Sequence, residues 1–186
     1  VPLGTAATTL TPAAADAPPA ARLREAGAVI VCKTTMPDYG MLSSSLSSFH
    51  RLARNPWDLA MNPGGSSAGA AAACAAGYGP LHVGTDIGGS IRLPAGWCGI
   101  FGLKPSQGRI AIHPPYAGRV AGPMTRTVQG FHDVRQAALH FDAAGAVHFA
   151  ELQVRVGDYS EQRIPIADQN AGHWRRRGGR HFLPVP

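Results

Sequence analysis

Long apolar runs, closely spaced cysteines and dense charge are all missing from this sequence of 186 residues. No stretch of about 18 apolar residues occurs, so no membrane-spanning helix is expected. The N-terminus has no basic stretch followed by an apolar core, so no secretory signal is expected either. Charged residues make up 15% and hydrophobic residues 45%, which argues against disorder driven by charge.

Cysteine is scarce and unpaired in sequence: only Cys32, Cys74 and Cys98 are present. An odd number without a close pair argues against a disulfide framework and fits a reducing compartment. We therefore expect a cytoplasmic protein. The spacings CxxC and HxxxH are also missing, so no metal site is predicted.

The sequence has a net positive charge but no recognisable nucleic-acid-binding motif. Four arginines lie within residues 173–186, so much of the basic excess belongs to a short terminal stretch. A nucleic-acid-binding face would need clustered basic residues with interleaved aromatics or a known motif, and neither is evident. We expect solvated arginines, with no nucleic-acid or membrane partner.

A layered α/β order is indicated near the N-terminus. Asp16 is expected to cap a helix that has Pro18 in its first turn and ends before Gly27. Residues 28–32 then form a short continuous apolar run, which is typical of a buried strand. Helix, glycine and strand in this order indicate an α/β architecture.

Further helices and strands are predicted to alternate with glycine-rich turns in the middle of the chain. Alanine-rich and apolar runs carry this prediction, and serine, asparagine, glycine and proline mark the loops. We expect helices at 68–76 and 92–97, strands at 81–85 and 99–103, and loops at 41–63 and 108–126.

The glycine-rich turns do not fit the common phosphate-binding and nucleophile motifs well. No lysine follows the glycines as in a P-loop, and a Rossmann fingerprint would need a strand before Gly64. Residues 65–69 do match GxSxG, the nucleophile elbow of α/β-hydrolases, with Ser67 as nucleophile. That motif also needs a preceding strand, which is not predicted here. Nucleotide binding and a nucleophile elbow are therefore alternatives with little support.

Two turns rich in glycine and serine could together form an acyl-transfer site. Ser66 and Ser90 lie 24 residues apart, and the intervening helix and strand can return the chain to the same sheet edge. Because Gly88 and Gly89 lack a Cβ, the backbone N–H groups from Ile87 onward can converge on one point. A serine hydroxyl could attack a carbonyl while these donors hold the oxyanion. The alternative is two turn serines that cap helices.

Five longer blocks of sequence carry a family resemblance. They are GAVIVCKTTMP at 27–37, RNPWD at 54–58, PGGSSAG at 63–69, GTDIGGSIR at 84–92 and CGIFGLKP at 98–105. In these blocks, residues 20–128 resemble the amidase signature family of amide hydrolases. The resemblance implies an α/β/α layered fold around a mixed β-sheet.

The resemblance also implies a chemistry and a set of roles. Such enzymes hydrolyse the C–N bond of a small-molecule carboxamide through a seryl-acyl intermediate, with a Ser–Ser–Lys triad and no metal or cofactor. By matching motifs, Ser90 would be the nucleophile and Ser66 the bridging serine, held by a cis Gly65–Ser66 peptide bond. The other implied roles are the oxyanion hole for Ile87, Gly88 and Gly89, and loop support for Ser67, Asp86 and Arg92.

The lysine of the triad is the main departure. In the family it lies in an upstream Gly-(Val/Ile)-Lys-Asp segment, and residues 1–19 contain nothing similar. Lys33 is expected to have a structural or site-lining role, and Lys104 and His82 structural roles. We therefore expect impaired amidase activity, and the alternative is a non-catalytic remnant that acts at most as a binding module.

Two regions of different character are expected. Residues 1–130 are expected to form a partial amidase signature domain. Residues 131–186 resemble none of the family's later segments and are expected to be a divergent, poorly ordered tail, from a shifted reading frame or an unrelated joined segment. A sheet that lacks strands at both ends would expose edges and apolar surface, so a homo-oligomer is also considered.

Overall fold

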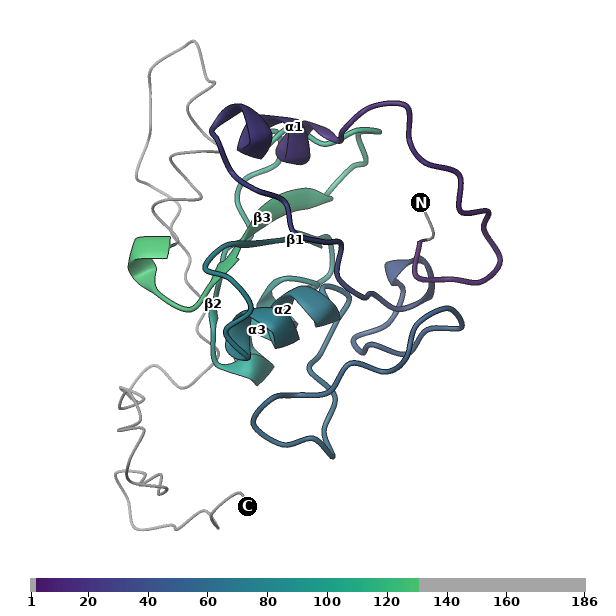
Figure 1. Cartoon of the computed structure of the whole chain (residues 1–186), viewed down its shortest axis with the longest axis vertical. Helices are drawn as coiled ribbons and strands as arrows, with labels where there is room; N and C mark the ends of the chain where they lie inside the picture. Colours follow the sequence, from purple (N-terminus) through teal and green to yellow (C-terminus); the bar gives the residue numbers. More distant parts are fainter. Residues whose placement is uncertain (1–2, 131–186) are drawn as a thin grey trace. The chain divides into compact units, whose positions relative to one another are not determined.

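The computed structural model describes residues 3–130, and the tail expected at 131–186 lies outside the described residues. Short helices and strands alternate along the described part, joined by long loops (Figure 1). Its elements are α1 (Pro18–Glu25), η1 (Asp38–Gly40), α2 (Ala68–Ala75), β1 (His82–Asp86), α3 (Arg92–Cys98), β2 (Phe101–Gly102) and β3 (Val120–Thr125). Within residues 3–130, no helix is long and apolar enough to cross a membrane.

The strands of the described part form one sheet in the order β1-β3-β2, with antiparallel pairing on both sides of β3. Helices α2 and α3 lie next to each other beside this sheet (Figure 1). Buried side chains of both helices and of β3 share one core, formed by Ala70, Ala71, Ile91, Ala95, Cys98 and Met124. Helices packed on a sheet confirm the predicted α/β class.

Helix α2 packs closely because its residues are small. Residues 68–71 and Cys74 are buried, and a Cβ added at Gly69 would lie 2.6 Å from Thr35 Oγ1 and overlap the Thr35 backbone nitrogen. The Gly69 N–H in turn donates to the Thr35 carbonyl oxygen at 3.0 Å. The helix ends before Gly77, which has a φ of +85°, as predicted.

Helix α1 begins at Pro18 and is followed by Gly27 at a φ of +85°, and both features were predicted. The prediction that Asp16 caps this helix is wrong, because the cap residue is Ala17 and no side chain caps the first turn. The Asp16 carboxylate instead forms an ion pair with Arg24 at 2.9 Å. A cation on the next turns of the same helix thus draws the carboxylate away from the backbone N–H groups.

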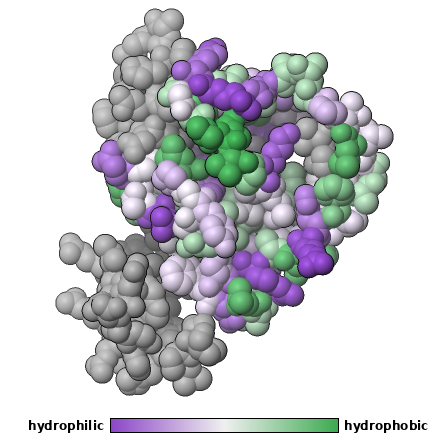
Figure 2. All heavy atoms as spheres, in the orientation of Figure 1, coloured by the Kyte–Doolittle hydropathy of each residue, from purple (hydrophilic) through white to green (hydrophobic). Residues whose placement is uncertain are grey.

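The strand predicted at residues 28–32 is not present. Val29 is 87% exposed and Val31 is 89% exposed. Hydrophobic side chains gather on the visible face below α1, where this segment runs (Figure 2). A buried strand needs a neighbouring strand and a covering layer, and none of β1, β2 and β3 pairs with this segment.

The loop predicted at residues 108–126 contains a strand, β3, all of whose residues are buried. Gly122 and Pro123 gave the signal of a turn. Gly122 is required because a Cβ there would overlap the carbonyl oxygen of Leu103, and the Pro123 carbonyl accepts the Leu103 N–H at 3.1 Å. Close backbone approach, which sequence does not show, explains the glycine. The strand predicted at 99–103 is shorter and covers only β2.

Candidate active site

The two serine-containing turns lie side by side. The N–H of Ser67, at the start of α2, donates to the carbonyl oxygen of Ser90 at 3.1 Å. The Ser67 hydroxyl also accepts the N–H of Thr85 at 3.2 Å and lies 3.3 Å from the Thr85 carbonyl oxygen. Helix α2 and strand β1 therefore return the chain to one place, as their spacing suggested. Because its hydroxyl is held by β1 and no strand precedes it, Ser67 is not the nucleophile of an elbow.

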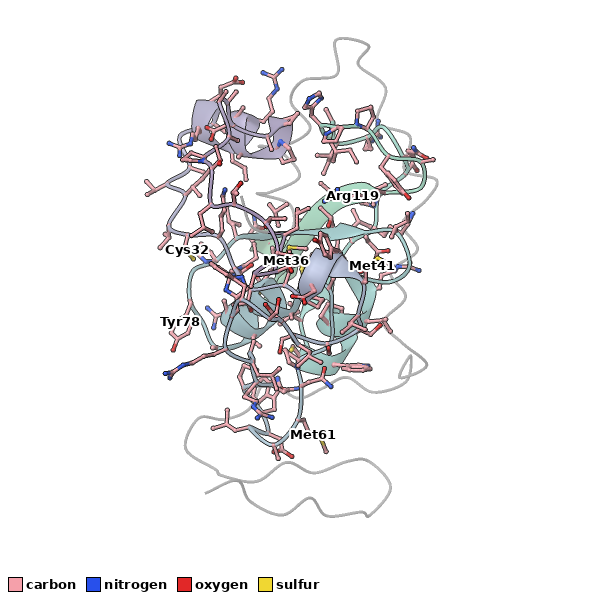
Figure 3. All side chains as sticks on the ribbon, turned by 90° about the vertical axis from the view of Figure 1, so that its right-hand side faces the viewer. Cys32, Met36, Met41, Met61, Tyr78 and Arg119 are labelled. Atoms are coloured by element: carbon pink, nitrogen blue, oxygen red, sulfur yellow. The ribbon has the colours of Figure 1, made fainter. Side chains whose placement is uncertain are left out.

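Ser66 lies next to Gly40, the last residue of η1, and its hydroxyl forms no hydrogen bond with the Ser90 hydroxyl. Its exposed fraction is 7%, and the Gly65–Ser66 peptide bond is cis, the configuration that the family resemblance implied. A Cβ added at Gly40 would lie 3.4 Å from Ser66 Oγ and 3.3 Å from Met36 Cε. Met36 and Met41 lie near the middle of the face shown in Figure 3. Sequence reasoning did not assign Met36 or Gly40 to the site, although a glycine next to a matched block was a usable signal.

Asp86 holds the turn that carries Ser90. Its side chain is fully buried, and its two oxygens accept backbone N–H groups on both sides of Ser90: Gly89 at 2.8 Å, and Ile91 at 3.0 Å. The Arg92 N–H adds a third backbone bond at 3.3 Å, and the Arg92 guanidinium donates two more at 3.0 Å each. The supporting roles expected of Asp86 and Arg92 thus have a direct geometric basis.

The charge of Asp86 is stabilised inside the protein. Burial by itself would raise the pKa of Asp86, but the Arg92 guanidinium and the three backbone donors outweigh it and hold the pKa below its ordinary value. The hydrogen bonds from Arg92 to Asp86 raise the pKa of Arg92 in turn. The turn is therefore built around a carboxylate and not around a neutral acid.

The backbone donors expected to form an oxyanion hole divide into two kinds. The N–H of Gly89, whose φ is +123°, is donated to Asp86. The N–H groups of Ile87, Gly88 and Ser90 donate to no other described residue. Space beside Gly88 is open, because a Cβ built there would have no atom within 4 Å. The unengaged donors next to Ser90 are available to a ligand.

Among residues 3–130, no lysine or histidine forms a hydrogen bond with Ser66 or Ser90. Neither Lys33 nor Lys104 forms a hydrogen bond or ion pair with any residue among 3–130. His82 lies at the first residue of β1, about 13 Å along the strand from Asp86. Burial lowers the pKa of His82, and its ring bonds to the Gly79 carbonyl oxygen at 3.3 Å. Within the described part, no cluster of His, Cys, Asp and Glu could hold a metal ion.

Comparison with known families decides the assignment. The family model described as Amidase matches residues 2–161. The chain belongs to the amidase family. The matched range continues past residue 130, where we expected the resemblance to end, and the domain boundary at that residue stays a prediction.

Curated relatives agree with this assignment. Over 139 residues the chain is 46% identical to the putative amidase AmiB2 of Mycobacterium tuberculosis, which covers 73% of this chain and 29% of that protein. Over 116 residues it is 50% identical to one subunit of the glutamyl-tRNA(Gln) amidotransferase of Chromohalobacter salexigens, with 60% of this chain and 24% of that protein covered. This member of the amidase family thus spans less than a third of the length of these relatives.

A solved structure shows the same fold. A bacterial aryl acylamidase of the amidase signature enzymes superposes with a TM-score of 0.65 at 35% identity, over 70% of this chain and 28% of that one. The α/β fold expected from the resemblance is therefore confirmed for the amidase-like part of the chain.

Proposed function

We propose that this amidase-family chain carries the nucleophile, relay and oxyanion-binding parts of a site that hydrolyses carboxamides. The observation that carries the proposal is the hydrogen bond between Ser67 N and Ser90 O, because it sets the turn of Ser66 against the turn of Ser90. Acyl transfer needs a serine hydroxyl, a group that takes its proton and donors for the oxyanion. These requirements fall on two adjoining turns.

The proposed reaction proceeds through an ester on Ser90. The Ser90 hydroxyl attacks the amide carbonyl, and its proton passes through the Ser66 hydroxyl to a base. The C–N bond breaks, the amine leaves with a proton, and water hydrolyses the seryl ester to free the acid. One oxyanion donor can lower the barrier by about 3–4 kcal/mol, so the unengaged N–H groups near Ser90 are a substantial contribution.

The set of proposed oxyanion-hole donors differs from the set that the sequence suggested. We assign the donors to Ile87, Gly88 and Ser90, whose N–H groups have no other acceptor within residues 3–130. Gly89 was expected to be a donor as well, but its N–H is engaged by Asp86. Its contribution in this proposal is to shape the turn, since its φ of +123° suits glycine.

The base is the part of the triad that the described residues do not supply. A serine is a poor nucleophile until a neighbouring group takes its proton. Because neither Lys33 nor Lys104 bonds to Ser66, we propose that the chain by itself hydrolyses simple amides slowly or not at all. With three unpaired cysteines, a reducing compartment such as the cytoplasm is the proposed location.

A fluorophosphonate probe tests the assignment, because it forms a covalent adduct with an activated serine. We expect peptide mass spectrometry to place the adduct on Ser90, with none in Ser90→Ala. Ser66→Ala should slow labelling about a hundredfold if Ser66 relays the proton to a base outside residues 3–130. The control is Thr9→Ala, which removes an exposed hydroxyl in the N-terminal loop and should leave the rate unchanged.

The second candidate function is a non-catalytic remnant that binds a partner. It is favoured by the exposed apolar residues around Val29 and Val31. This candidate predicts no adduct on Ser90, or an adduct spread over exposed serines at equal rates. Either result would overturn the proposed hydrolase site.

A further inference from the structure

Helix α3 begins two residues after Ser90 and is too short to be stable by itself. It has only seven residues, includes Pro94 and Gly96, and its N-cap residue, Ile91, has no side chain that could cap it. Helices this short are unstable in water, and glycine and proline lower helix stability further. The last backbone carbonyls of a helix also lack partners within it. Both ends of α3 therefore depend on bonds from outside the helix.

Asp86 supplies these bonds at the N-terminal end, and the loop at residues 55–61 supplies them at the C-terminal end. The side-chain amide of Asn55 donates to the carbonyl oxygen of Trp97 at 2.9 Å. The indole N–H of Trp57 donates to the carbonyl oxygen of Cys98 at 2.7 Å. Two donors from one loop thus satisfy two consecutive carbonyls at the end of α3.

Hydrogen bonds within the loop hold its two donor residues, Asn55 and Trp57, in fixed positions relative to each other. The Asn55 side-chain oxygen accepts the N–H of Trp57 at 3.0 Å, which links the two donor residues directly. The Asn55 N–H donates to the Met61 carbonyl oxygen at 3.0 Å and closes the loop. Met61 lies at the lower end of the described part in Figure 3. Asn55 itself is 8% exposed and has little freedom to turn away.

From this loop the chain runs back along α3 to the serines. The Cys98 thiol lies 3.4 Å from the Pro63 carbonyl oxygen and donates to it. Gly64 follows against the helix, since a Cβ there would lie 2.8 Å from the Pro94 Cα. The path ends where Ser67 N donates to Ser90 O. Residues 55–67 therefore contact α3 at its C-terminal end, at its middle and at the turn that begins it.

We propose that Asn55 and Trp57 are positioning residues for Ser90, a proposal that rests on the proposed amidase site. They fix the C-terminal end of a helix about 10 Å long whose other end is the Ser90 turn. The same segment carries Ser66, so one set of bonds fixes both serines relative to each other. Loss of the two donors lets α3 tilt and fray, and the Ser90 turn moves against the Ser66 turn.

The matched pair of tryptophans makes a sharp test. Trp57 and Trp97 are 47% and 48% exposed, but only the Trp57 indole N–H bonds to the backbone of α3. Trp57→Phe removes that donor and keeps an aromatic ring, and Trp97→Phe is the control because it leaves the Trp97 carbonyl in place. The measurement is hydrogen–deuterium exchange of the full chain, read by mass spectrometry in peptides covering 63–67 and 87–93.

Trp57→Phe is expected to speed exchange in both peptides by about fivefold to tenfold, the ratio expected for one lost hydrogen bond that holds a local structure. Exchange in α1 should stay unchanged in Trp57→Phe, and Trp97→Phe should change neither site peptide by more than about twofold. A uniform rise over all peptides, or a rise confined to 92–98, would show a merely structural role and overturn the proposal.

Asn55→Asp is the second variant, and it keeps the acceptor for the Trp57 N–H while removing the donor to Trp97. The same pattern of exchange is expected. Where Ser90 is labelled by fluorophosphonate, both variants should lower the maximal labelling rate and leave the half-saturating probe concentration unchanged. Since exchange needs no reactive serine, absence of labelling counts against the proposed hydrolase, whereas unchanged exchange counts against the positioning role.

Discussion

Arg92 lies against the buried carboxylate of Asp86 and donates two hydrogen bonds to it, from Nε and Nη2, at 3.0 Å each. The arginine side chain is 39% exposed, whereas the aspartate is fully buried. One partner therefore remains in contact with solvent while the other is enclosed by the turn that it holds. Because these hydrogen bonds need an ionised Asp86, the turn should lose stability when low pH protonates the carboxylate.

Acid should unfold this protein in part through Asp86. Its pKa is lowered in the folded protein, so its contribution to stability is fully present above the ordinary aspartate pKa of 3.8 and is lost as pH falls through the lowered value. Melting temperatures measured between pH 7 and pH 2 should therefore drop in the region below about pH 4.

Asp86→Asn gives this prediction its control. The amide keeps one acceptor and loses the charge, so we expect a cost of about 2–3 kcal/mol at neutral pH, where the wild-type carboxylate is ionised. The difference between the two proteins should shrink as pH falls below about 4. A difference that stays constant down to pH 2 would contradict the account of Asp86.

Two glycines inside helices should respond to alanine with opposite signs. Gly69→Ala in α2 places a Cβ 2.6 Å from Thr35 Oγ1 and against the Thr35 backbone, so we expect a loss of about 2–3 kcal/mol. Gly96→Ala in α3 meets no atom within 4 Å and should stabilise by about 0.5–1 kcal/mol through helix propensity. Urea unfolding of both variants checks the pair, and equal effects would contradict the packing of α2 against residues 34–35.

The three cysteines should differ in reactivity. Burial raises the pKa of Cys74 to about 11, and burial together with the neighbouring Cys74 raises the pKa of Cys98 to about 12. Cys32 is exposed. At about pH 8, a disulfide reagent should modify one thiol per native chain, mapped to Cys32, and all three after denaturation. Rapid modification of Cys74 or Cys98 in the native protein would show that the core between α2 and α3 is open.

Short-range signals predicted much of the fold. The alanine run of α2, the apolar run of β1 and the glycines that end α1 and α2 act over a few residues, and they lie where the sequence placed them. Which distant segments pair with each other could not be predicted from the sequence. Residues 28–32 have the composition of a strand without a partner among the described strands, whereas β3 is a strand whose Gly122 and Pro123 suggested a turn.

The candidate site also combines features that local motifs predicted with features that depend on long-range contacts. Ordered motifs and their spacing predicted that the turns of Ser66 and Ser90 belong together, and their backbones do meet. The engagement of the Gly89 N–H by Asp86 depends on where a buried carboxylate points, which no local pattern encodes. The bonds from Asn55 and Trp57 to α3 join residues more than forty positions apart, so the RNPWD block gave a match but not a role.

The distance between the Ser66 and Ser90 hydroxyl oxygens in a crystal structure of this chain tests the central claim most directly. The two hydroxyls do not hydrogen-bond to each other in the described residues. The account therefore predicts that a bound acyl ligand brings the two oxygens to about 3 Å, with the N–H groups of residues 87, 88 and 90 directed at the ligand. Hydroxyls on opposite faces of the joined turns, or side chains filling the space beside Gly88, would contradict it.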